Sequence, residues 1–177
     1  VALKDPRTGE VLGYEAQYVG KAELVRGESI EETSNGKGDI RTDAVPATID
    51  ITATKEEIRA GDRLLPAAAR AFVSYTPHAP RQEVDARVVS IYGGSAFANA
   101  AQNQVIAISM GERDGMQSGH VLNLLTQGAR IKDATDPAKT TIKLPNESNG
   151  MAMVFRTFDR VSYALILDVR TTVRVGD

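Results

Sequence analysis

The chain has 177 residues, with 21 Lys and Arg against 23 Asp and Glu, a net charge of −2 and no cysteine. This length suffices for one substantial domain that buries about 70% of its unfolded surface, and a nearly balanced charge without a basic block argues against a nucleic-acid partner. The missing thiols exclude disulfides, thiolate metal sites and cysteine nucleophiles, and no apolar run approaches the roughly 20 residues of a transmembrane helix.

Strands dominate the elements that the sequence predicts. Alternating polarity and β-branched residues favour strands at 11–20, 45–54, 83–92, 104–110, 120–125, 151–158 and 161–175. Helical signals are confined to TKEEIRAG at 54–61, where Thr54 and Glu57 have the spacing of a capping box, and to PAAARAF at 66–72. We therefore expect an all-β protein, with one or two short helices and antiparallel sheets that form a small barrel or sandwich.

Three polar or glycine-rich segments, 28–39, 93–103 and 133–150, separate the predicted strands. Their composition cannot support a core, so they are expected to be surface connections, any of which can serve as a binding loop. A single domain over 1–177 is expected, with a division at residue 80 into an N-terminal β segment and a β core (81–177) as the alternative. The predicted core positions are Val88, Ile91, Val105, Ile106, Ile108, Val121, Leu122, Leu124, Val154, Phe155, Leu165 and Leu167.

A short pattern recurs at 58–62, 116–120 and 173–177: an apolar residue, two spacers, glycine, and then Asp or His. Such a segment turns a corner in a small β domain, because glycine tolerates a positive φ where a Cβ would clash. The apolar residue is predicted to close one end of the core. The polar residue after the glycine is predicted to face solvent or to cap a neighbouring amide.

Few residues in the sequence have the types and spacings that catalytic or metal sites require. The only histidines, His78 and His120, lie 42 positions apart, so neither HExxH nor HxH occurs, and a zinc site requires both histidines and a carboxylate brought together by the fold. A Ser-His-Asp arrangement stays open by composition, since four serines accompany His120, but no GxSxG elbow is present. The four serines are Ser90, Ser95, Ser109 and Ser118.

Glycoside hydrolysis requires a pair of carboxylates, but with 23 acids the sequence does not indicate which two would form it. No glycine-rich phosphate-binding motif occurs. We therefore expect no catalytic residue, no cofactor and no metal. The candidate binding residues are Phe97, Asn99, Arg113, Asp114 and His120.

Four segments carry a resemblance to a known family: GDRLLP (61–66), RVVSIYGG (87–94), QNQVIAISMGERDGMQSGHVLNLL (102–125) and MVFRTFDRVSYALIL (153–167). They resemble the region that follows the LysM module in a group of bacterial LysM-containing envelope proteins. The resemblance implies a parent protein with a signal sequence and a peptidoglycan-binding LysM module upstream of this chain, located in the periplasm. It carries no catalytic residues. The expected function is that of a non-catalytic accessory or scaffolding domain with protein partners in the cell envelope.

Three alternatives stay open beside this expectation. One is a cell-wall hydrolase that uses carboxylates or a serine-histidine pair. Another is a direct binding module, in which the segment 93–103 closes over a glycan or a small ligand. The third is a homo-oligomeric assembly module, in which a free strand edge pairs with another subunit.

Overall fold

The computed structural model describes residues 1–34, 40–67, 75–93, 99–135 and 137–177. Strands account for nearly all of its regular structure, and every strand pairs antiparallel with its neighbour. In the described residues the helical structure is a single 3₁₀ turn, Glu112–Asp114, and no helix there has the length and apolarity to cross a bilayer. The all-β prediction is confirmed.

The chain divides into two units. One consists of residues 1–16 together with 71–177, and the other of residues 17–70. The first sixteen residues therefore belong with the C-terminal part of the sequence.

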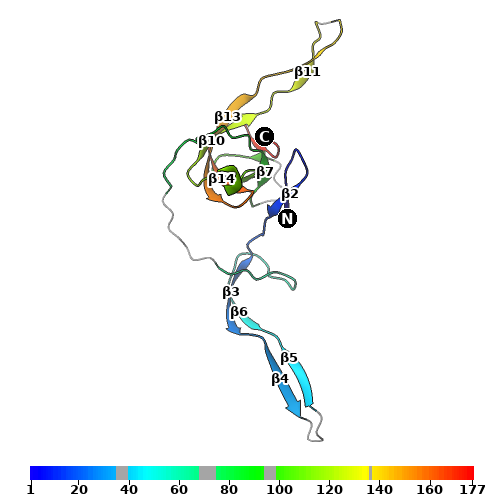
Figure 1. The fold of residues 1–177 in the computed structure, drawn as a ribbon, viewed down its shortest axis with the longest axis vertical. Coiled ribbons are helices and arrows are strands. Elements are labelled where there is room, and N and C mark those ends of the chain that lie inside the picture. Colours follow the sequence, from blue (N-terminus) through cyan, green and yellow to red (C-terminus); the bar gives the residue numbers. More distant parts are fainter. Residues whose placement is uncertain (35–39, 68–74, 94–98, 136) are drawn as a thin grey trace. The chain divides into compact units, whose positions relative to one another are not determined.

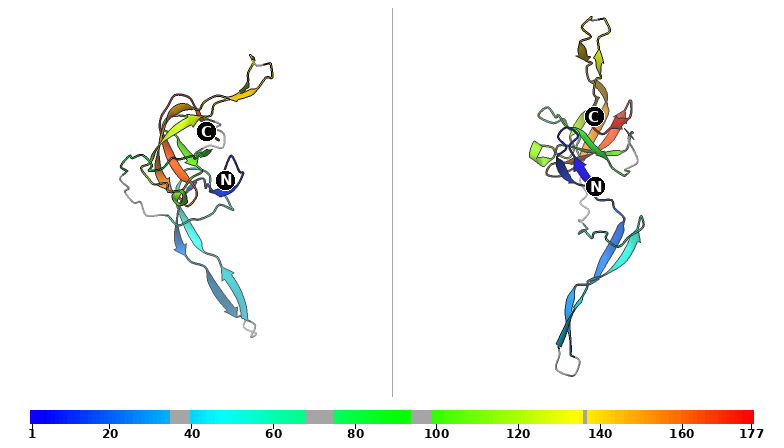
Figure 2. Two further views of the ribbon diagram at one scale, coloured as in Figure 1. Left: turned by 45° about the horizontal axis from the view of Figure 1, so that its top comes forward. Right: turned by 90° about the vertical axis from the view of Figure 1, so that its right-hand side faces the viewer.

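A five-stranded sheet that curls into a half-barrel forms the centre of the first unit (Figure 2). Its strand order is β10-β13-β14-β9-β7. The strands are β7 (Val88–Ile91), β9 (Val105–Ile108), β10 (Val121–Thr126), β13 (Glu147–Thr157) and β14 (Ser162–Val169). At the β7 edge, the C-terminal residues join the sheet: the Val88 N–H donates to the Asp177 carbonyl and the Gly176 N–H to the Val88 carbonyl, both at 2.9 Å.

Smaller strand pairs surround this sheet. β1 (Ala2–Lys4) pairs with β2 (Val11–Tyr14), and β8 (Asn99–Ala100) pairs with β15 (Val173–Arg174). β11 (Arg130–Lys132) pairs with β12 (Thr141–Lys143) in a hairpin that extends from β10 and β13 away from the sheet (Figure 1).

The main core lies on one face of the half-barrel, and a smaller cluster around Leu3 and Val161 lies on the other. Burial confirms six of the predicted core residues: Val88, Ile91, Ile106, Ile108, Leu124 and Val154. The other six are only half-buried. In β14 the prediction was one residue out of register, since Ala164 and Ile166 are buried whereas Leu165 and Leu167 are not. Alternation cannot be read in YALIL because all five residues are apolar.

The helix predicted at 54–61 is wrong. Thr54 ends strand β6 (Thr48–Thr54), and the N–H groups of Lys55 and Glu56 both donate to the Val19 carbonyl, at 2.8 and 3.1 Å. A segment this short does not form a helix unless tertiary packing stabilises it. The second helical candidate, 66–72, lies mostly outside the described residues, and its first two residues are not helical.

The second unit is a long two-stranded ribbon. β3 (Gly20–Arg26) pairs with β6, and β4 (Ser29–Ser34) pairs with β5 (Ile40–Val45), so the two ladders follow one another along the ribbon (Figure 1). The surface connection predicted at 28–39 is therefore wrong over β4. The one at 133–150 is likewise wrong over β12 and the start of β13. These strands are short and bury no face, so the sequence pattern missed them.

Candidate functional site

The recurring glycine pattern folds into the same tight turn three times. Gly61, Gly119 and Gly176 have φ angles of +101°, +99° and +98°. In each turn the residue after glycine donates its N–H to the carbonyl three residues earlier: Asp62 to Arg59 at 3.1 Å, His120 to Gln117 at 3.2 Å, and Asp177 to Arg174 at 3.1 Å. The predicted positive φ of these glycines is confirmed.

The side chain of the residue after each glycine forms a second hydrogen bond within the turn. It accepts the N–H of the residue that opens the turn: Asp62 Oδ2 from Arg59 at 2.8 Å, Asp177 Oδ2 from Arg174 at 2.8 Å, and His120 Nδ1 from Gln117 at 3.3 Å. The apolar residues Met116 and Val173 are buried, and Ile58 is half-buried. The prediction of a capped corner is confirmed, and His120 occupies the place that aspartate takes in the other two turns.

His120 is 5% exposed and is held by its neighbours. Because its Nδ1 accepts the Gln117 N–H, the neutral ring carries its proton on Nε2. The Met116 sulfur lies 3.4 Å from Nδ1, and the His78 ring stands edge-on with centroids 4.8 Å apart. Backbone bonds secure this contact: the His78 N–H donates to the Gly119 carbonyl at 3.0 Å, and the Val121 N–H donates to the His78 carbonyl at 2.9 Å.

The fold thus brings both histidines together. In the residues that the structure describes, no group of three or more His, Asp or Glu side chains could hold a metal ion. The pairing was not foreseen because it joins positions 42 apart, and no local pattern signals such a contact.

Burial lowers the pKa of His120, and the neighbouring His78 lowers it further. Protonation therefore favours the unfolded chain, in which the pKa returns to its ordinary value of 6.5. The stability that the neutral ring contributes is fully present above 6.5 and is lost as the pH falls from there toward the lowered value.

The free energy of unfolding is therefore expected to fall when the pH is lowered from about 7.5 to about 5.5. Urea unfolding at both values, followed by tyrosine fluorescence, measures this. The matched variant is His120→Asn, whose amide oxygen can still accept the Gln117 N–H but does not titrate, and its unfolding should depend less on pH. An equal pH dependence in both proteins contradicts the assignment.

The three described serines of this set form hydrogen bonds away from His120. Ser90 Oγ donates to Glu15 at 3.2 Å, Ser109 Oγ accepts the Arg87 N–H at 2.9 Å, and Ser118 Oγ donates to the Phe155 carbonyl at 3.4 Å. Ser95 lies outside the described residues. The described hydroxyls therefore stabilise the backbone or the N-terminal segment.

Two of the candidate binding residues serve the 3₁₀ turn. Asp114 Oδ2 accepts the Gly111 N–H at 2.9 Å and caps the turn, and Arg113 forms an exposed ion pair with Asp159 at 3.7 Å. The hydrogen bond to Gly111 gives Asp114 a structural role. An exposed ion pair such as Arg113–Asp159 contributes little to stability.

Asn99, another candidate, links β8 to the C-terminal strand. Its Oδ1 accepts bonds from Arg174 Nε at 3.0 Å and from Thr172 Oγ1 at 3.4 Å. Phe97, the last candidate, lies outside the described residues. Of the described candidates, Arg113 and Asp114 lie together in the 3₁₀ turn, whereas Asn99 and His120 make their contacts elsewhere.

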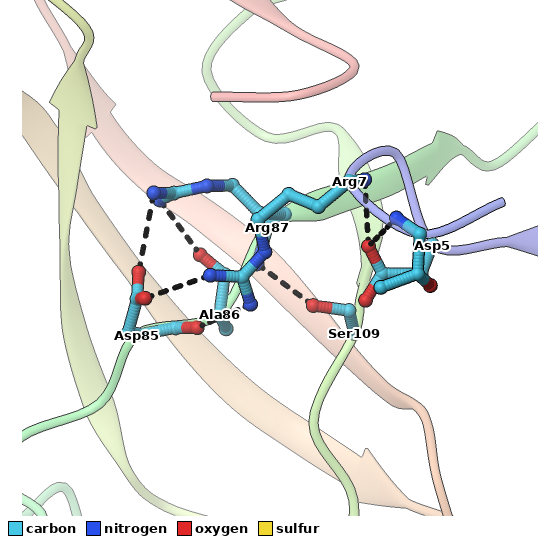
Figure 3. A network of polar contacts seen from close by, with 7 residues as sticks. Asp5, Arg7, Asp85, Ala86, Arg87 and Ser109 are labelled. Carbon is cyan, nitrogen blue, oxygen red and sulfur yellow. Dashed lines mark hydrogen bonds and ion pairs between the residues drawn. The ribbon is translucent and has the colours of Figure 1, made fainter. Parts of the chain in front are cut away.

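A polar network fastens the N-terminal turn to the segment before β7 (Figure 3). Asp85 bridges two guanidinium groups, Arg7 at 2.8 Å and Arg87 at 3.2 Å. Asp5 Oδ1 accepts the Arg7 N–H at 2.7 Å, and the Arg87 backbone N–H donates to Ser109 Oγ at 2.9 Å. Asp85 thus binds both guanidinium groups, whereas the buried Arg87 Nε has no hydrogen-bond partner among the described residues. The network holds the N-terminal segment to the sheet.

Glu15 makes a second attachment of this N-terminal segment. Its Oε2 accepts hydrogen bonds from Tyr163 Oη at 2.8 Å and from Ser90 Oγ at 3.2 Å. Burial, and after it the Glu15 carboxylate, raises the pKa of Tyr163. The phenol therefore stays a neutral donor that holds the segment to the sheet.

Two adjoining depressions, of about 350 and 470 Å³, lie over β10, β13 and β14. They share Ser148 and Arg170, and neither is lined by a histidine. The charged residues of their lining are Glu147, Asp168 and Arg170.

In the β3–β6 ladder of the second unit, apolar side chains are exposed on one face, and the acids Glu23 and Asp50 lie on the other face with Lys21. Leu24 lies opposite Ile49 in the β3–β6 ladder, and Ile51 lies on the same face. Leu24 is 69% exposed and Ile51 51%. On the other face Glu23 lies directly opposite Asp50. The described residues supply no third strand to cover the apolar side chains.

The outer ladder of the ribbon repeats this arrangement only in part. Strand geometry places the exposed Ile30 and Ile40 on one face together with Glu32, and Glu31 lies directly opposite Asp43 on the other face, which also carries Arg41. An isolated two-stranded hairpin is marginally stable in water, and stability requires a third strand or a packed face. The ribbon therefore has the features of a surface that is completed by a partner.

The β11–β12 hairpin has the opposite charge. Arg130 lies directly opposite Lys143, with Lys132 on the same face, and Ile131 lies opposite Ile142 on the other face. The hairpin was not predicted because its bases are interspersed with apolar and polar residues and form no basic block. The available signal in the sequence was the alternation of Arg130, Ile131 and Lys132 in β11.

The two hairpins thus expose apolar and charged side chains side by side. The corner, the 3₁₀ turn and the N-terminal network are occupied by internal contacts. Among known proteins, the sequence matches no protein-family model and no curated protein.

Proposed function

We propose that this chain is a non-catalytic scaffolding domain that acts through protein contacts made by its ribbon, at the β3–β6 ladder. The observation that carries the proposal is the ribbon itself, two strands with exposed leucine and isoleucine on one face and no covering strand in the described chain. Apolar side chains gathered on an exposed face mark an interaction surface.

The open edges of the ribbon supply the mode of binding. Among the described strands, β3 and β6 pair only with each other, so each has a row of free backbone donors and acceptors. An added strand satisfies these groups, and its alternate side chains cover the apolar face. Strand addition is therefore the contact that this surface fits.

The setting proposed for this scaffold is the bacterial cell envelope. It rests on the resemblance of 61–66, 87–94, 102–125 and 153–167 to the region behind LysM modules. In this proposal a LysM module upstream holds the parent protein on peptidoglycan in the periplasm, and the present chain recruits a protein partner there.

Photocrosslinking tests the ribbon as a binding surface. With a photoreactive residue in place of Leu24, in the parent protein in its native envelope, irradiation is expected to join the chain to another polypeptide. The matched control is Leu65, which is 71% exposed, against 69% for Leu24, but lies outside the ribbon strands.

Adducts from position 24 and none from position 65 support the proposal. Equal adducts at the two positions, or none at position 24, contradict it. Mass spectrometry of the adduct identifies the partner and separates a second copy of the chain from a different protein.

A further inference from the structure

We propose that the partner of the acidic ribbon is the basic β11–β12 hairpin of a second copy of this chain, joined head to tail by strand addition. This inference rests on the proposed scaffolding function and names the occupant of its surface. It is carried by the opposite charges of the two hairpins and by the match between their apolar faces.

The ribbon strands carry an acidic excess at defined positions. β3, β4, β5 and β6 contain five acids and three bases. Two cross-strand pairs place like charges directly opposite each other, Glu23 with Asp50 and Glu31 with Asp43. Such pairs destabilise a ladder. The exposed Arg41 ion pair at 2.9 Å offsets only the charge of Asp43.

The β11–β12 hairpin also places like charges opposite each other, but here both are positive. The six residues of β11 and β12 contain three bases and no acid. Arg130 lies directly opposite Lys143, again a destabilising like-charge pair. Basic side chains brought beside the ribbon acids relieve the repulsion in both ladders. When the ribbon of one copy binds the β11–β12 hairpin of another, repulsion between like charges in each ladder is therefore replaced by attraction between opposite charges.

The apolar faces match in the same geometry. Ile131 and Ile142 form the apolar face of the hairpin and are 43% and 40% exposed. If an edge of the hairpin is hydrogen-bonded to an edge of the ribbon, strand alternation lets the acids and bases share one face of the joined sheet. Leu24 then lies with the two isoleucines on the other face.

Each copy carries one ribbon and one hairpin, so the contact is heterologous. A heterologous contact uses a different surface on each partner and generates a ring where the rotation closes, or an open chain where it does not. The arrangement suits a scaffold because every added copy presents a fresh surface to the next one.

Sedimentation velocity of the purified chain tests this assembly. At low salt, the mean mass is expected to rise above 19.0 kDa as the protein concentration increases. In about 1 M NaCl the Debye length shrinks to about 3 Å, which screens exposed charges. The association is expected to weaken at least about tenfold there, since complementary charges at such a contact no longer attract.

Charge reversal separates the two surfaces. The ribbon variant Glu23→Lys with Asp50→Lys and the hairpin variant Arg130→Glu with Lys143→Glu should each stay monomeric. An equimolar mixture of the two should assemble again, because each reversed surface meets an opposite charge on the other variant. Far-UV circular dichroism checks that both variants keep their strands.

The matched control for the hairpin variant reverses Lys4 and Arg81 to Glu, two exposed bases outside both hairpins. It makes the same change of net charge and should assemble as the unmodified chain does.

Monomers of the unmodified chain at every concentration overturn the second copy as partner. So does assembly that survives either reversal, or a mixture that fails to assemble. Adducts from position 24 to a different protein, found together with such monomers, leave the scaffolding function standing. Absence of adducts removes both proposals.

Discussion

Replacing Ile166 with alanine is expected to lower the free energy of unfolding by about 2–5 kcal/mol. Ile166 is fully buried in β14, in the same cluster as Ile106 and Val154. Removing its aliphatic atoms leaves a cavity at the centre of the five-stranded sheet, which backbone bonds on both sides keep from collapsing. Urea unfolding, together with hydrogen exchange of the β13 and β14 amides, measures the loss.

Leu167→Ala is the matched control for this prediction. It removes a side chain of similar size from the next position of the same strand, where the residue is only half-buried. Its expected cost is about 1 kcal/mol. Equal costs at 166 and 167 would show that the alternation of β14 is misplaced.

Gly119→Ala is expected to destabilise the first unit by about 2–5 kcal/mol, from two causes that add. A φ of +99° is strained for any L-residue with a Cβ, at about 1–2 kcal/mol. The new Cβ would also lie 2.7 Å from the Thr76 carbonyl oxygen and 3.0 Å from His78 Cε1. Overpacking of this kind costs about 1–3 kcal/mol more, so the segment around His78 must move away from the corner.

Gly176→Ala isolates the backbone part of this effect. Gly176 has a φ of +98°, and nothing lies within 4 Å of the position of its Cβ. The expected cost is therefore about 1–2 kcal/mol, that of the strained φ alone. Limited proteolysis gives a second readout: cleavage at 75–80 should accelerate in Gly119→Ala and stay unchanged in Gly176→Ala. Similar behaviour of the two variants argues against the close packing of His78 on the corner.

The strand-rich core and the three corners were readable from the sequence for a common reason. Both depend on local residue types, since β-branched residues favour a pleated strand and glycine alone takes a positive φ without strain. For the polar residue after the glycine, the sequence left open exposure to solvent or capping of a neighbouring amide, and the structure shows capping by Asp62, Asp177 and His120.

Predictions failed where local pattern and tertiary environment disagree. Capping-box spacing at Thr54 and Glu57 predicted a helix, but Thr54 belongs to β6. The pairing of β6 with β3 outweighs the weak helical propensity of so few residues. The polar strand β4 was missed because it pairs by backbone bonds alone and buries no face.

The sequence by itself determined the all-β class, the places where glycine bends the backbone and the poverty of reactive groups, since each follows from residue types and short spacings. Only the tertiary structure decided that Ile166 rather than Leu167 faces the core, that His78 lies against His120, and that like charges lie directly opposite each other in the ribbon and in the β11–β12 hairpin. These features depend on pairing between residues far apart in the chain. Short spacings along the sequence do not indicate which distant segments pair.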